Sequence, residues 1–187
     1  MTLFEYVAVA ASLVCSFVAV RLLGGLGAVL QPGRRYWVHA TWVFGCLFGI
    51  SLFWWLFWSY REVEWDYVRF LMALSPPAIL YVIVALLIPA DAQSVRSWQH
   101  HYNEIRVRFF VLNLAYVAAL ILNGVVLLGQ PILHQRRLGP GVLGAMYVLG
   151  LVSEHPKLHA AIVLVFVGIE VIASASLLRP GSFGVAP

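Results

Sequence analysis

Two charged residues stand inside long apolar segments of this 187-residue chain. Arg21 lies about nine residues, or roughly 13 Å of helix, from the end of the first segment, and Glu170 lies near the middle of the last. Counted from one face of a six-helix arrangement, Glu170 is roughly 20 Å deep. Because a lone charge in an apolar interior costs several kcal/mol, we expect Arg21 and Glu170 to form a buried ion pair.

The expected pair has more than one reading. It could relay protons or ions, or it could be a static contact between helices. Alternatively, Arg21 extends toward the surface and Glu170 is protonated, so that neither charge is buried.

Two histidines, His39 and His159, fall at similar depth near the same end of the expected helices. Imidazole is a common axial ligand of haem, so we hypothesise that His39 and His159 bind a cofactor. The sequence does not identify which cofactor. Interfacial hydrogen bonding is the alternative. A metal centre needs several converging ligands, and no HExxH pattern accompanies these histidines.

Pro76 and Pro77 occupy the middle of the third apolar segment and predict a helix kink. Each proline removes a backbone donor, so a carbonyl is freed that Ser75 or a neighbouring helix must satisfy. A kink at this depth could serve as a gating hinge or a ligand niche, or it could be a fixed packing shape.

Small and aromatic residues mark two further features of the second segment. Gly45 and Gly49 form a GxxxG pair, which predicts close helix packing either within the chain or in a homodimer. Trp54, Trp55 and Trp58 form an aromatic girdle. Such a girdle is typical of interfacial anchoring, and it could also contact a pigment or quinone ring or a partner subunit.

The composition indicates the elements that position these residues. Hydrophobic residues make up 62% of the chain and charged residues 11%, far from the roughly 45–50% and 25% of soluble domains. Five segments reach the length of about 20 apolar residues that a membrane-spanning helix needs. These segments are residues 3–30, 36–60, 66–88, 107–129 and 157–178.

A sixth apolar segment, residues 138–152, is shorter, at roughly 22 Å of helix, and is interrupted by glycines. We therefore predict an all-α integral membrane bundle of six transmembrane helices, or of five plus one re-entrant segment. Pro156 should stand in the first turn of the last helix. No polar linker divides the chain, so residues 1–187 form a single domain.

Several short motifs follow one another in a distinctive order along about the first 115 residues. They are Glu5, Ser12, residues 21–26 (RLLGGL), residues 53–55 (FWW), residues 86–89 (LLIP), His101-Tyr102 and residues 108–110 (RFF). This order resembles a group of small bacterial multi-pass membrane proteins with no known activity. The resemblance implies a bacterial inner (plasma) membrane and supplies no site.

The sequence favours a non-catalytic protein, because it contains no nucleophile elbow, phosphate-binding glycine loop or paired carboxylates. Its arginines are scattered, so a nucleic-acid partner is not expected. We expect an accessory or scaffold subunit of a larger membrane complex, such as an energy-transducing one with pigments, quinone or haem nearby. Its partners would be membrane lipids and other membrane subunits, or a second copy.

The alternative is a small ion or solute transporter, a channel or a membrane sensor. Arg21, Glu170 and the Pro76-Pro77 kink would carry that function.

Overall fold

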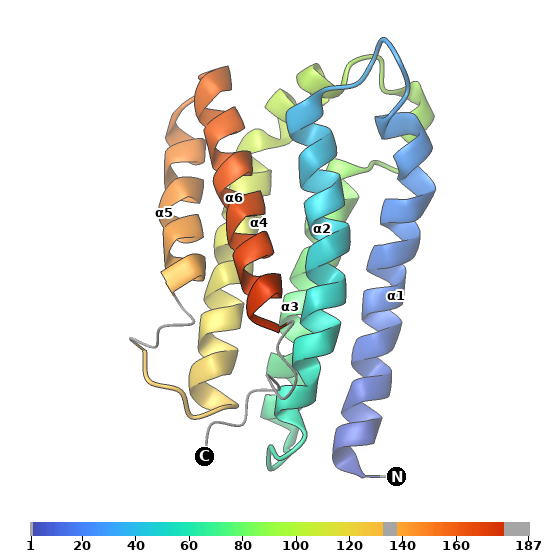
Figure 1. The fold of residues 1–187 in the computed structure, drawn as a ribbon. Coiled ribbons are helices and arrows are strands. Elements are labelled where there is room, and N and C mark those ends of the chain that lie inside the picture. The colour runs from blue at the N-terminus through green and yellow to red at the C-terminus, as the bar shows by residue number, and fades with distance from the viewer. Residues whose placement is uncertain (1, 133–137, 178–187) are drawn as a thin grey trace.

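The computed structural model describes residues 2–132 and 138–177, and this part of the chain is all-helical (Figure 1). Its elements are α1 (Leu3–Val29), α2 (Trp37–Leu56), η1 (Phe57–Tyr60), α3 (Tyr67–Leu87), η2 (Ala92–Ser94), α4 (Trp98–Val126), α5 (Leu138–Val152) and α6 (Pro156–Leu177). Five of the helices are long and apolar enough to cross a membrane, and α5 is shorter. The prediction of an all-α fold is confirmed.

Successive helices run in opposite directions (Figure 1). We call the end at the top of Figure 1, where α1, α3 and α5 finish and α2, α4 and α6 begin, the upper end, and the opposite end the lower end. Contacts close a ring in the order α1, α3, α4, α5, α6, α2 and back to α1. Helix α2 therefore lies between α1 and α6.

Polar caps fix where the helices begin. Thr2 and Glu5 form a capping box at α1, and the Asp66 carboxylate accepts a hydrogen bond from the Arg69 backbone N–H at α3. The Ser97 hydroxyl accepts from the His100 N–H, which starts α4 at Trp98. Side chains thus satisfy backbone donors that have no partner inside their own helix.

Helix α4 begins well before the predicted boundary at residue 107. Residues 98–106 are mostly polar, so hydropathy places them outside the apolar segment, but the Ser97 cap starts the helix there. Trp98, Tyr102 and Arg106 follow one another at four-residue spacing and all are buried. The first turns of α4 therefore bury one face whose side chains all carry hydrogen-bonding groups.

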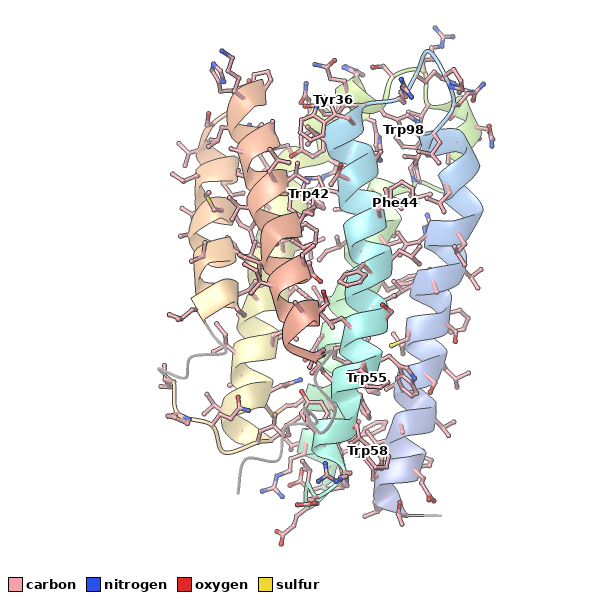
Figure 2. All side chains as sticks on the ribbon, in the orientation of Figure 1. Tyr36, Trp42, Phe44, Trp55, Trp58 and Trp98 are labelled. Carbon is pink, nitrogen blue, oxygen red and sulfur yellow. The ribbon has the colours of Figure 1, made fainter. Side chains whose placement is uncertain are left out.

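Aromatic rings fill the middle and upper part of the core. Trp42 is buried on α2, and its ring lies 4.6 Å from that of Phe166, 5.0 Å from Phe109 and 6.1 Å from Tyr147, centroid to centroid. Figure 2 shows Trp42 beside α6. These contacts join α2, α4, α5 and α6, and such tilted ring pairs add to the stabilisation that burial gives.

The outer face of the bundle is apolar on all six described helices. Large apolar side chains that are well exposed include Val9, Phe17, Val20, Phe44, Phe48, Leu71, Val82, Val111, Leu122, Val142, Val148, Leu164, Val171 and Ile172. A soluble protein rarely exposes continuous apolar patches of this extent.

Candidate functional site at the start of α4

The first turns of α4 supply side chains that bind the ends of other helices. Because α1, α3 and α5 finish where α4 begins, their last carbonyls have no N–H partner within their own helix. Trp98 Nε1 donates to the Ala28 carbonyl at the end of α1, at 2.8 Å. His101 Nε2 lies 2.9 Å from the Leu86 carbonyl near the end of α3, where it acts as the donor.

Arg106 binds the end of α5. Its Nη1 donates to the carbonyls of Gly150, Leu151 and Ser153 at 2.9–3.0 Å, and Nη2 donates to Glu154 Oε1 at 2.9 Å. The Arg106 side chain is 10% exposed, whereas that of Glu154 is 84% exposed. A cation at this position is favoured by the negative end of the α5 dipole, and its hydrogen bonds are charge-assisted.

His159 joins α6 to the same network. Its Nδ1 lies 3.1 Å from the Tyr102 hydroxyl and its Nε2 lies 2.9 Å from the Ser153 carbonyl. Since a carbonyl only accepts, Nε2 carries the proton and Nδ1 accepts from Tyr102. We call Trp98, His101, Tyr102, Arg106 and His159 the capping cluster. It connects the ends of α1, α3 and α5 to α4 and α6.

The expected cofactor ligands do not form an open pair. His39 is fully buried, its ring stacks on Trp98 at 4.7 Å, and neither of its nitrogens makes a well-formed hydrogen bond in the described part of the chain. His39 and His159 both pack against the Tyr102 ring, and His159 uses both nitrogens within the protein. His159 thus has both nitrogens engaged and His39 has neither in a well-formed hydrogen bond among the described residues, and a cofactor at these two histidines stays a prediction.

The structure does not bring Arg21 and Glu170 together. Arg21 Nε donates to the Ile88 carbonyl, just after α3, at 3.0 Å. Glu170 faces α2, where its Oε1 would lie 3.9 Å from a Cβ added at Gly49. With α2 between α1 and α6, the expected ion pair is not formed among the described residues.

Glu170 is instead an acid in a mixed interior site. Its Oε2 is buried and has no hydrogen-bond partner in the described residues. Cys46, Tyr116 and Tyr147 lie within electrostatic range of the carboxyl group. The carboxyl group thus faces α2, and its Oε2 has no polar group within hydrogen-bond distance in the described part of the chain.

Pro76 and Pro77 are buried inside α3, which remains helical from Tyr67 to Leu87. Pro76 has no N–H for the Met72 carbonyl four residues before it. That carbonyl accepts instead from Ser75 Oγ and from Asn123 Nδ2 of α4, both at 2.8 Å. The expectation that Ser75 or a neighbour satisfies the freed carbonyl is confirmed, and the arrangement favours a fixed packing shape.

The GxxxG pair packs α2 against α6. A Cβ added at Gly45 would lie 2.1 Å from the Phe166 ring, so any larger residue there must shift the ring. Gly45 and Gly49 face Phe166 and Glu170, which have the same four-residue spacing on α6. Of the two predicted uses of these glycines, the contacts support packing within the chain.

The aromatic girdle lies at the lower end, where Figure 2 shows Trp55 and Trp58. Trp54, Trp55 and Trp58 are each about half exposed. Trp58 contacts the Phe4 ring edge-on and lies under the Arg61 guanidinium, 5.8 Å from its carbon. Trp58 is therefore held by Phe4 and Arg61, while about half of each girdle side chain is exposed on the outer surface.

Arg106 and Trp98 were not recognised as site residues in the sequence. Their spacing with Tyr102 was the available indication, because bulky and charged residues four apart on a capped helix share one face. Comparison of the chain with protein-family models, with curated proteins and with solved structures finds no match of any kind.

Proposed function

We propose that this chain is a multi-pass integral membrane protein of a bacterial inner membrane and a non-catalytic accessory subunit of a larger membrane complex. The apolar outer face supports the membrane location. On α1, large apolar side chains are exposed at Leu3, Tyr6, Leu13, Phe17 and Leu23, along a helix of 27 residues, or roughly 40 Å. Lipid is the solvent that matches such a surface.

The capping cluster is the observation that favours an accessory role. Its imidazole, indole, hydroxyl and guanidinium groups are bound to one another, to backbone carbonyls or to the Glu154 carboxylate. Groups held in this way stabilise a rigid frame and are not free for substrate. We therefore place the accessory function on the outward surface.

The girdle of Trp54, Trp55 and Trp58 is the proposed contact face. Tryptophan is enriched at the energetic centres of protein interfaces, because a large ring excludes water or lipid at little cost in conformational entropy. The partner would be another membrane subunit or a second copy of this chain.

Site-specific photo-crosslinking at native expression level tests this role. A photoreactive residue at Trp55 or Trp58 should give one discrete adduct, whereas one at Leu122, which is exposed on α4, should label only lipid. Monomeric protein without adducts from any position would contradict the proposal. An absorption spectrum of the extracted complex would reveal pigment, quinone or haem brought by the partner.

A transporter, channel or sensor is the second candidate, and the unpartnered Oε2 of Glu170 is the observation in its favour. This function would use Arg21, Glu170 and the Pro76-Pro77 kink. It predicts proton or cation flux in liposomes that Glu170→Gln abolishes and Glu104→Gln, on the exposed start of α4, leaves intact. An accessory subunit should give no flux above that of empty liposomes.

A further inference from the structure

Arg21 lies at the outer seam between α1 and α3 with most of its donors unused. Nε donates to the Ile88 carbonyl, and Nη1 and Nη2 have no partner among the described residues. In hydrocarbon, an unpaired guanidinium costs several kcal/mol. If the chain spans the membrane as proposed, the missing partner must come from outside the described part of the chain.

A groove lies on the same seam, nearer the middle of the bundle. It has a volume of about 380 Å³, is open to the outside and is lined by Val14 and Phe17 of α1 and by Ala78 and Tyr81 of α3. These are apolar groups apart from one phenol oxygen. The groove therefore fits a hydrocarbon chain better than a polar solute.

Arg21 and the groove are aligned along one helix face. Val14, Phe17 and Arg21 follow one another at spacings of three and four residues, so they share a side of α1. Arg21 is about one turn, or roughly 6 Å, above Phe17. Higher still, Gly24 is exposed, and a Cβ added there would meet nothing within 4 Å. The surface thus offers room above a cation and an apolar groove below it.

The depth of Arg21 suits a lipid phosphate. If a hydrocarbon layer of about 30 Å is centred on α1, Arg21 lies roughly 8 Å below its upper edge, within reach of an extended arginine side chain. The planar guanidinium matches phosphate oxygens. Arg34, Arg35 and Arg96 in the connections at the upper end add positive charge, which favours an anionic headgroup.

We propose that the seam between α1 and α3 binds one anionic phospholipid. Its phosphate pairs with the free nitrogens of Arg21, and an acyl chain occupies the groove of Val14, Phe17, Ala78 and Tyr81. The binding rests on the membrane location proposed above and is independent of the accessory role. It also accounts for Arg21 without Glu170.

Native mass spectrometry of protein extracted in mild detergent with equal amounts of phosphatidylglycerol and phosphatidylcholine tests the site. The wild type should retain one phosphatidylglycerol per chain. Arg21→Gln should lower that retention at least fivefold, whereas Arg108→Gln, at an exposed arginine of α4, should leave it unchanged. Equal retention of both lipids by the wild type, or of phosphatidylglycerol by wild type and Arg21→Gln, would overturn the proposal.

A second variant tests the groove while Arg21 stays in place. Ala78→Phe fills the groove and should remove the bound lipid, and Val111→Phe, on the exposed face of α4, is the matched control. Circular dichroism melts confirm that both variants fold. Retention by Ala78→Phe equal to that of Val111→Phe would show that the groove is not the site. Release of the chain from membranes by alkaline carbonate would instead contradict the membrane location itself.

Discussion

The capping cluster and the aromatic girdle, at opposite ends of the bundle, place their large side chains in opposite ways. At the upper end, Trp98, Tyr102 and Arg106 turn inward and are buried. At the lower end, Trp55 and Trp58 turn outward and are half exposed (Figure 2). The contrast teaches that the same residue types can hold helices together at one end and leave a contact face at the other.

The arginines show the same difference. Arg106 is nearly buried and its guanidinium donates to three carbonyls and one carboxylate. Arg61 at the lower end pairs with Glu62, whose side chain is 81% exposed. Exposed pairs of this kind contribute roughly 0–1 kcal/mol, whereas hydrogen bonds to a buried charge contribute more. The upper end should therefore dominate stability.

The largest expected effect is that of Arg106→Ala, which leaves the last carbonyls of α5 without donors. We expect the free energy of unfolding in mild detergent to fall by about 3 kcal/mol. Arg108→Ala, two residues further on and exposed, should change it by less than about 0.5 kcal/mol. Equal losses in the two variants would show that the capping cluster does not hold this end together.

Gly45→Val tests the close packing of α2 against α6, between the two ends of the bundle. The new side chain must displace the Phe166 ring, so we expect a loss of about 2 kcal/mol in the same unfolding measurement. Gly49→Ala is the matched control, because its Cβ would lie at an ordinary 3.9 Å from Glu170 Oε1. A tolerated valine at Gly45 would mean that α2 and α6 are less closely packed.

A smaller effect is expected for Asn123→Ala in the lower half. The Met72 carbonyl loses the Asn123 donor but keeps Ser75 Oγ, so the loss should be about 0.6–1 kcal/mol. Ser75→Ala in the same background should add to it, because the carbonyl then has neither donor. If Asn123→Ala cost as much as Arg106→Ala, the contrast between the two ends would disappear.

The smallest effect on stability should come from the double variant Trp55→Ala, Trp58→Ala. Half-exposed rings contribute little to the fold of the isolated chain, so unfolding should change by less than about 1 kcal/mol. The mass of the gently extracted complex should nevertheless fall. Leu122→Ala should alter neither the free energy of unfolding nor the mass of the complex. If the complex keeps its mass in the tryptophan variant, the girdle is not the contact face.

Hydropathy predicted most of the fold, because a continuous apolar run has few other interpretations. The short helix α5 lies at the predicted residues 138–152, and Pro156 begins α6 as expected. The start of α4 was missed since its first turns are polar, and their burial depends on carbonyls supplied by helices distant in sequence. No local pattern contains that information.

The sequence predicted the depth of a residue along its helix better than it predicted which helices are neighbours. Residue counting places Arg21 and Glu170 at comparable levels, but it does not tell which helices are neighbours, and α2 separates them. Gly45 and Gly49 were correctly expected to allow close packing, although their partner on α6 could not be named. The depth of a residue follows from counting along its own helix. Its neighbours depend on the order in which the six helices are arranged around the ring, which the count does not contain.

The position of Arg106 also has a consequence for the order in which the chain is assembled. The carbonyls and carboxylate that bind it are 44 to 48 residues downstream. At the usual pace of synthesis of about 5–20 residues per second, Arg106 exists for roughly 2–9 s before Gly150 is made. The first four helices are therefore synthesised before the groups that bind Arg106 and Tyr102 exist. The hydrogen bonds at the upper end are completed only after α5 and the start of α6 have been made.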